Sequence, residues 1–172
     1  MSQHVNIEND EITVPYYAVH DDGKICGFFG AFRFLSNFYM LEEGGICLDE
    51  MYYPSVEHAY QAAKWPYHMR EQFLADITPG EAKKLGQEAP KLNRKKWDKQ
   101  KVSIMSAFCG QKFWNNPKMK QMLLMTEDCH LEERNSWGDT FWGTDVNGVG
   151  ENNLGKILMM IRSDIATNKE MF

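Results

Sequence analysis

The sequence predicts one helix-rich domain to which a few short strands contribute. The chain has 172 residues, of which 43% are hydrophobic and 13% aromatic, so it is long and apolar enough to form one folded core. Short apolar runs next to glycines precede residue 54, which is typical of strands. Apolar residues at helical spacing recur from residue 55 to residue 165, which indicates several helices.

Residues 1–24 are polar and acidic, and we expect them to form an N-terminal extension to a domain that covers residues 25–172. Residues 1–11 are expected to be frayed or loosely packed, whereas 12–19 and the apolar run 25–29 are predicted strands. A hairpin is expected over residues 42–51, with the turn at residues 43–45 and its second strand at 46–48.

A helix is predicted to begin at Ser55, whose hydroxyl group is suited to cap the first turn, and to end before Pro66. Within it, Glu57, Gln61 and Lys64 follow one another at helical spacing and share one flank. Two interpretations stay open. The carboxylate and the amine form an acid and base pair that lines a pocket, or the flank is an ordinary solvated helix face.

Further helices are predicted over residues 67–76, from the capping-box sequence that begins at Thr78, over 93–114, and from Pro117. The last helix begins near Leu154 and is capped by Asn152 or Asn153, so its N-terminus is able to hold an anion. Before it, residues 131–153 form a glycine-rich segment with two tryptophans and Asp139, which indicates either a functional loop or a plain surface loop.

Residues 29–39 are dense in aromatic side chains, between which Arg33, Ser36 and Asn37 are interleaved. Neither the helical nor the strand period fits this segment. It either forms a pocket wall that stacks on a base or anchors a small core as a buried irregular segment.

The charge of the chain is unevenly distributed. The net charge of −5 does not predict a nucleic-acid-binding protein, but residues 81–101 hold eight Lys or Arg against three acids. This local excess suits a phosphorylated ligand or a nucleic-acid backbone, and it is equally compatible with an exposed helix face.

The four cysteines are scattered, without a CxxC pair or a metal-ligand spacing to histidine. With no secretory leader recognised and no apolar run long enough to span a bilayer, these thiols predict a reduced, cytoplasmic protein in which they fill the core. No metal or other cofactor is expected.

Several motifs together resemble the NADAR family, also called YbiA-like, in the family's own order over residues 25–163. The motifs are Phe34-Leu35-Ser36-Asn37-Phe38-Tyr39, Tyr53-Pro54-Ser55-Val56-Glu57-His58-Ala59-Tyr60-Gln61-Ala62-Ala63-Lys64, Trp97 with Met105 and Lys112-Phe113, Trp137-Gly138-Asp139 with Phe141-Trp142-Gly143, and Asn153-Leu154-Gly155 with Leu158-Met159 and Arg162. The resemblance implies a single helix-rich α+β domain with short strands. It also implies cleavage of N-glycosidic bonds to ribose.

The resemblance implies a role for each matching residue. Lys64 is the nucleophile that forms a Schiff base with the ring-opened ribose, which requires an uncharged amine. Glu57 transfers the proton, and Asp139 is the second carboxylate, for ribose hydroxyls or the leaving group. The remaining residues contact the base or phosphate, wall the pocket, or hold phosphate at a helix N-terminus, and they are Arg33, Ser36, Asn37, Trp97, Trp137, Trp142 and Asn153.

The implied partner is an ADP-ribosylated or phosphoribosylated base. We expect ADP-ribose to be removed from a modified base such as guanine, including such a base within nucleic acid, and no membrane to be involved. The other family activity, hydrolysis of phosphoribosylamino-pyrimidine intermediates of riboflavin synthesis, is the first alternative. A module that binds ADP-ribose or nucleic acid without turnover is the second. Direct hydrolysis by two carboxylates is the mechanistic rival to the Schiff base.

Overall fold

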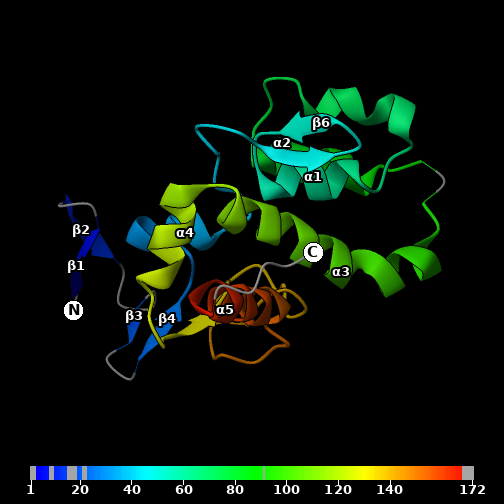
Figure 1. The fold of residues 1–172 in the computed structure, drawn as a ribbon. Coiled ribbons are helices and arrows are strands. Elements are labelled where there is room, and N and C mark those ends of the chain that lie inside the picture. The colour runs from blue at the N-terminus through cyan, green and yellow to red at the C-terminus, as the bar shows by residue number, and fades with distance from the viewer. Residues whose placement is uncertain (1–2, 8–9, 15–18, 21–22, 91, 168–172) are drawn as a thin grey trace. The chain divides into compact units, whose positions relative to one another are not determined.

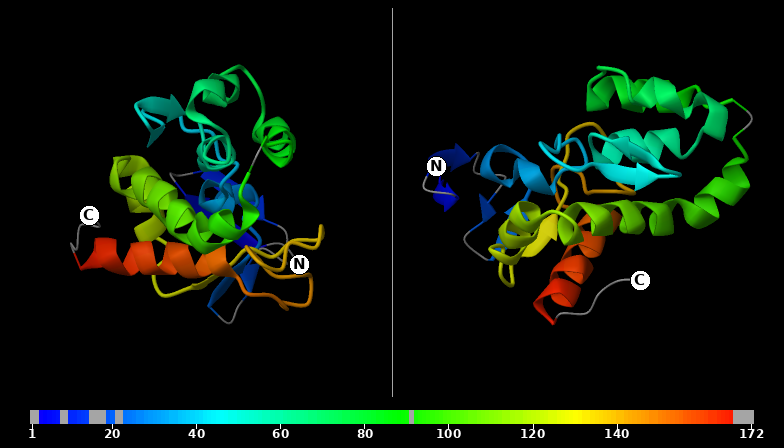
Figure 2. Two further views of the ribbon diagram at one scale, coloured as in Figure 1. Left: turned by 90° about the vertical axis from the view of Figure 1, so that its right-hand side faces the viewer. Right: turned by 45° about the horizontal axis from the view of Figure 1, so that its top comes forward.

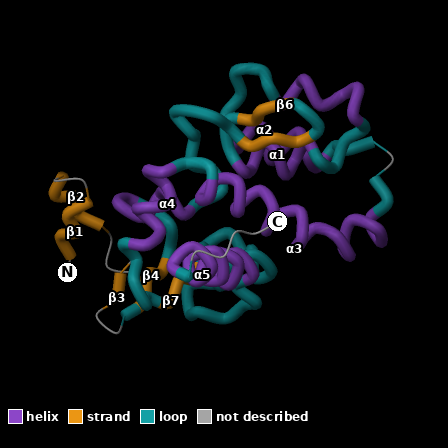
Figure 3. The backbone as a smooth tube through the Cα atoms, viewed as in Figure 1, coloured by secondary structure: helices purple, strands orange, loops and turns teal. Residues whose placement is uncertain are grey.

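The computed structural model describes residues 3–7, 10–14, 19–20, 23–90 and 92–167. Helices predominate and the strands are few and short (Figures 1 and 3), so the predicted helix-rich α+β class is confirmed. The chain folds as two compact units, Met1–Ser36 with Lys118–Phe172 and Asn37–Pro117.

The first unit contains two small sheets. Strands β1 (Gln3–Ile7) and β2 (Asp10–Val14) form an antiparallel hairpin, so the described residues among 1–11 are paired and not frayed, while their loose packing stays a prediction. Strand β4 (Lys24–Cys26) pairs with β3 (Val19–His20) on one side and, in parallel, with β7 (His130–Glu132) on the other. The predicted strand over 12–19 is therefore split between β2 and β3, and residues 15–18 lie outside the described part of the chain.

Helix α5 (Asn153–Ala166) packs on β7 in the first unit, as Figure 3 shows. Its apolar side chains are buried, namely Leu154, Ile157, Leu158, Ile161 and Ile165. The predicted helix from Pro117 is α4 (Pro117–Leu124), and the aromatic segment begins as the 3-10 helix η2 (Gly30–Leu35). In η2, four of the six residues are buried and Arg33 is exposed.

The second unit is built around α1 (Val56–Ala62), all seven residues of which are buried. Helix α1 packs against α2 (Pro79–Gln87), α3 (Arg94–Trp114) and the hairpin of β5 (Ile46–Leu48) with β6 (Met51–Tyr53). Figure 2 shows α3 as the longest helix. The caps predicted at Ser55 and Thr78 are confirmed, because each hydroxyl group accepts a hydrogen bond from a first-turn amide.

Two predictions for the second unit are wrong. The hairpin lies at β5–β6, and its turn is formed by Asp49 and Glu50 with positive φ values of 49° and 67°, instead of residues 43–45. Such a turn matches the twist of the strands, and Asp is favoured at its first position, but its second position usually holds Gly and here holds Glu50, so the sequence signal for it is incomplete. Residues 67–76 form a shorter 3-10 helix, η3 (Tyr67–Phe73), in which Phe73 is buried and Met69 is exposed.

Candidate active site

Glu57, Gln61 and Lys64 form a continuous chain of hydrogen bonds on α1 and the turn that follows it. The Lys64 Nζ atom donates to Gln61 Oε1 at 2.6 Å, and Gln61 Nε2 donates to Glu57 Oε1 at 2.7 Å. The side chains of Glu57 and Gln61 lie in the interior, since these residues are 5% and 4% exposed. The interpretation of this flank as a solvated helix face is therefore wrong.

Lys64 lies in an aromatic and mostly cationic environment. Its Nζ atom lies 5.2 Å from the centre of the Tyr60 ring and 5.7 Å from that of Trp97, and these rings are in contact with centroids 5.1 Å apart. Burial is the largest cause that lowers the pKa of Lys64. The Glu57 carboxylate opposes it, and the charges of Lys83 and Arg94 add to it, so the net shift is downward.

Glu57 and Lys64 are thus brought together as predicted, but through an amide instead of directly. A carboxylate can only accept hydrogen bonds, so the amide nitrogen of Gln61 must face Glu57 and its oxygen must face Lys64. A neutral amine that donates one N–H to this oxygen keeps its lone pair, which is the form that a nucleophile needs.

The first turn of α1 is anchored by His58 and Asn37. His58 Nε2 lies 3.0 Å from the Ile77 carbonyl oxygen and must donate to it, so Nδ1 accepts from the Ser55 hydroxyl group at 2.7 Å. Burial lowers the pKa of His58, which is consistent with this neutral ring. The Asn37 carbonyl accepts from the Glu57 amide at 3.0 Å. We interpret His58 as a structural residue.

The side chain of Asn37 is engaged within the core. Its amide nitrogen lies 3.2 Å from Met105 Sδ, and its oxygen lies 3.6 Å from Cys109 Sγ. Both ends of the amide therefore have partners on α3, and a contact with a substrate base, as the resemblance implies, stays a prediction. The other two polar residues of the segment belong to the first unit: Arg33 is exposed on η2, and Ser36 is half-buried at its C-terminal end.

In the first unit, a tight loop brings Asp139, Trp142 and Asn153 together. Asp139 Oδ1 accepts from the Trp142 amide at 2.9 Å, and the Asn153 side chain donates to the Phe141 carbonyl at 2.8 Å. Trp142 is half-buried and meets the Phe141 ring edge-on, with centroids 5.0 Å apart. Trp137, by contrast, is 58% exposed.

The start of α5 differs from the expected anion site. Asn152 occupies the N-cap position in the left-handed region, and its side chain bonds the Leu131 carbonyl and the Glu133 amide instead of the helix. The amide groups of Asn153 and Leu154 donate to loop carbonyl groups. These two donors of the helix N-terminus are therefore already used.

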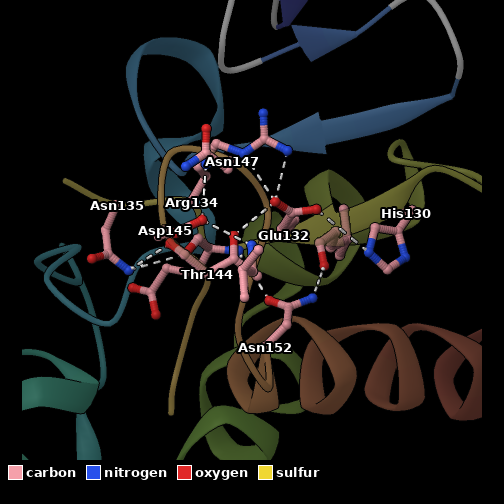
Figure 4. A network of polar contacts seen from close by, with 11 residues as sticks. His130, Glu132, Arg134, Asn135, Thr144, Asp145, Asn147 and Asn152 are labelled. Carbon is pink, nitrogen blue, oxygen red and sulfur yellow. Dashed lines mark hydrogen bonds and ion pairs between the residues drawn. The ribbon is translucent and has the colours of Figure 1, made fainter. Parts of the chain in front are cut away.

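A buried polar network holds this loop on β7 (Figure 4). The Glu132 carboxylate accepts from Thr144 Oγ1 at 2.7 Å and from Arg134 Nε at 2.9 Å and Nη2 at 2.8 Å. Burial would raise the pKa of Glu132, but these hydrogen bonds outweigh it and the pKa is lowered. Asn135 donates to the carbonyl groups of Asp139 and Thr144, so Asp139 is positioned from both sides.

Sequence reasoning missed several residues. It gave no role to Gln61, to Gly86 of α2, which packs against the Gln61 side chain, or to Lys112, which is 1% exposed. Burial, the dominant cause, lowers the pKa of Lys112 to about 7. Lys112 lies at helical spacing from Met105 and Phe108, on the buried face of α3, and this spacing was the available signal for a buried amine.

Among the described residues, no three or more His, Cys, Asp or Glu side chains form a group that could hold a metal ion. In the same part of the chain, no helix combines the length and the apolar character needed to cross a bilayer. Cys26 and Cys109 are buried, in agreement with the prediction that thiols fill the core.

Comparison with known proteins gives consistent results. The model of the NADAR domain family matches residues 27–166, which include most of both compact units. An N-glycosidase of Nostoc punctiforme is 38% identical over 125 residues, which cover 70% of this chain and 80% of that protein. A riboflavin biosynthesis protein of Vibrio vulnificus is 36% identical over 135 residues, and the match spans 77% of this chain but only 35% of that longer protein.

A solved structure is also similar. The NMR structure of the Escherichia coli protein YbiA superposes with a TM-score of 0.73 at 29% identity, over 90% of this chain and 91% of that chain. An N-glycosidase YbiA of Escherichia coli is 31% identical over 125 residues, which cover 72% of this chain and 78% of that protein. Together with the helix-rich fold and the ordered motifs, the family match and these relatives show that the chain belongs to the NADAR family.

Proposed function

We propose that this chain is an N-glycosidase that hydrolyses the bond between a base and a phosphorylated ribose, with Lys64 as the nucleophile. The observation that carries the proposal is the environment of Lys64, a half-buried amine against two aromatic rings whose hydrogen bond goes to an amide oxygen. The names of the Nostoc punctiforme and Escherichia coli relatives support the same reaction class.

The electrostatics of the amine suit this role. A lysine attacks carbon only when it is uncharged, and burial lowers the pKa of Lys64 toward the range in which that form is populated. Lys83 and Arg94 act in the same direction through charge repulsion. The same cations favour a ligand that carries phosphate, because a bound anion compensates the positive charges gathered there.

The proposed reaction proceeds in three steps. The C1′–O4′ bond breaks, O4′ takes a proton, and C1′ stays bound to the base nitrogen as an imine. The Lys64 Nζ atom then adds to C1′, its proton passes to the base nitrogen, and the bond from C1′ to the base breaks. Water finally adds to the lysine imine, which releases an open-chain sugar and restores the amine.

The carboxylates complete the proposal. Glu57 supports proton transfer around Lys64 and, through Gln61, fixes where the amine lies. Asp139 accepts hydrogen bonds from ribose hydroxyl groups or protonates the leaving group. We retain Arg33, Ser36, Asn37, Trp97, Trp137, Trp142 and Asn153 as proposed substrate contacts.

Two substrates are proposed within this class. ADP-ribose on a modified base such as guanine is the first, because the sequences Phe32-Arg33-Phe34-Leu35-Ser36-Asn37-Phe38-Tyr39 and Tyr60-Gln61-Ala62-Ala63-Lys64 resemble that branch of the family. A phosphoribosylamino-pyrimidine intermediate of riboflavin synthesis is the second. It is favoured by the names of two relatives, the Vibrio vulnificus protein and a riboflavin biosynthesis protein of Zea mays that is 34% identical over 155 residues.

A product screen by mass spectrometry tests the proposal. An oligonucleotide with ADP-ribosylated guanine and a phosphoribosylamino-pyrimidine are offered side by side, with and without borohydride. We expect one base to be released, and a reduced sugar adduct to map to Lys64. Lys64→Ala should lose both signals, whereas Lys99→Ala, at an exposed position of α3, should keep them.

Each rival has its own outcome in this screen. Base release that survives in Lys64→Ala without any adduct indicates direct hydrolysis by carboxylates. Saturable binding of either compound with no base released over hours indicates a binding module, and it refutes the proposed enzyme.

A further inference from the structure

Gln61 lies between the two charged groups of the proposed site. It is the residue that receives the hydrogen bond of Lys64 Nζ, at 2.6 Å, and it donates to Glu57 at 2.7 Å. An amide can meet both neighbours at once, because its N–H group donates to the carboxylate while its oxygen accepts an N–H of the amine.

We propose that Gln61 is a positioning residue, which spaces the Lys64 amine from the Glu57 carboxylate by one amide and so keeps that amine available as a nucleophile. This inference rests on the proposed function, in which Lys64 attacks the sugar. It assigns a role to a neutral residue that touches neither the sugar nor the base in the reaction described above.

The physical reason is the distance dependence of the charge interaction. A carboxylate in direct contact stabilises the ammonium form and shifts a pKa by about one to three units. Coulomb energy falls inversely with distance, so inserting an amide between the two groups removes roughly half of the interaction. The pKa of Lys64 agrees with this, because burial outweighs the opposing effect of Glu57.

Helix α2 fixes the amide from its other side. A Cβ atom at Gly86 would overlap the Gln61 amide oxygen and would lie 2.7 Å from Cδ and 2.8 Å from Cβ of the same side chain. Gly86 is buried, and only a residue without a side chain leaves room for the amide. The orientation of Gln61 is thus determined by Glu57, Lys64 and Gly86 together.

Site-resolved titration of Lys64 tests the inference without requiring any enzyme activity. The intact protein is labelled with trace acetic anhydride between about pH 6 and 10.5, and acetylation of each lysine is quantified by peptide mass spectrometry. The variants are Gln61→Glu, which replaces the amide by a second carboxylate, and Gln61→Ala, which removes the side chain that separates Lys64 from Glu57. Gln87→Glu is the matched control, since it adds a carboxylate at an exposed position of α2.

We expect the apparent pKa of Lys64 to rise by at least about one unit in Gln61→Glu, which adds a charge in contact, and in Gln61→Ala, in which no side chain keeps the amine from the Glu57 carboxylate, so that labelling near pH 7.5 falls about tenfold. Gln87→Glu should change it by a few tenths at most. Circular dichroism selects the variants that are folded. If Gln61→Glu does not fold, Gln61→Ala alone decides. An unchanged titration of Lys64 in a folded Gln61 variant overturns the inference.

The outcomes for the two proposals can be told apart. Where the protein releases a base, the acidic limb of its pH–rate profile should move upward by the same amount as the Lys64 titration. A shifted titration in a protein that releases no base supports the role of Gln61 and refutes the proposed function. If the protein releases a base but the apparent pKa of Lys64 is the same in the native protein and in the Gln61 variants, only the present inference is refuted.

Discussion

Lys112 gives a prediction whose size follows from the structure. The side chain lies in the core of the second unit, with Nζ 5.4 Å from the centre of the Tyr39 ring and 5.1 Å from that of Phe113. Burial lowers its pKa from 10.5 to about 7, and the neighbouring Cys109 acts in the opposite direction. Replacing Lys112 by Met should therefore change how the stability of the protein depends on pH.

The sign follows from the protons bound in each state. Above about pH 10.5 the amine is neutral in the folded and the unfolded chain, so it adds no pH dependence. Between pH 10.5 and 7 the unfolded chain binds a proton that the folded chain excludes, so the free energy of unfolding falls as the pH falls. Below about pH 7 both states are charged and the full penalty persists.

The magnitude is about 1.4 kcal/mol for each pH unit, which amounts to roughly 5 kcal/mol over the whole interval. Urea unfolding is measured near pH 7.5 and near pH 9.5, two values that lie about two pH units apart within this interval. Relative to Lys112→Met, the native protein should gain about 2.7 kcal/mol between these two values. Taking the difference between the two proteins cancels the other titrating groups.

Lys99→Met is the control, because it removes the same charge from an exposed position of the same helix. Its unfolding free energy should run parallel to that of the native protein. Parallel curves for the native protein and Lys112→Met over the same pH interval would show that the amine is charged in the folded state, and the reasoning from burial would then be wrong.

Three further predictions concern packing and the loop. Gly86→Ala should destabilise the protein by about 1–3 kcal/mol and raise the apparent pKa of the active-site lysine, as measured by urea unfolding and acetylation. Glu132→Gln should cost about 1–3 kcal/mol in urea unfolding, because its arginine partner loses a charged acceptor in the interior. Asp139→Asn should leave the melting temperature nearly unchanged, since an amide oxygen can still accept from the Trp142 amide, while base release falls at least about tenfold.

Each of these predictions has a matched comparison. Gly80→Ala on the same helix would place its methyl group in ordinary contact, 3.9 Å from Thr78 Oγ1, and should be neutral or slightly stabilising. Glu127→Gln changes an exposed acid and should leave stability within about 0.5 kcal/mol. Asp139→Ala should lower both stability and base release. Full activity in Asp139→Asn would show that its charge is not used.

The sequence was most informative where the signals are local. Ser55 and Thr78 are predicted caps, and both are confirmed, because capping depends on residues only three positions apart. The turn at Asp49 and Glu50 was not predicted, because Asp is a usual choice for positive φ but Glu is not, and Gly44-Gly45 gave the stronger turn signal nearby. It is the pairing of β5 with β6 that defines this turn.

The sequence predicted which residues of α1 and the following turn belong to the candidate site, but it did not predict how their side chains are arranged. Helical spacing placed Glu57 and Lys64 on one flank, and the resemblance assigned their roles. Spacing does not say which end of the Gln61 amide faces which neighbour. That depends on Gly86, which lies further along the chain in another helix. Helical spacing places Lys112 on the apolar face of α3, but how completely the amine is buried depends on how α3 packs against the rest of the unit.

The hydrogen bond from His58 to the Ile77 carbonyl group affects which part of the second unit can unfold locally. It ties α1 to the chain just before α2, so both ends of the stretch from residue 65 to 77 are fastened independently of η3. Tyr67 and Leu74 of this stretch are exposed. Amide hydrogens in η3 should therefore exchange with solvent through local unfolding that leaves α1 folded. Insertions into η3 should accordingly have little effect on Lys64.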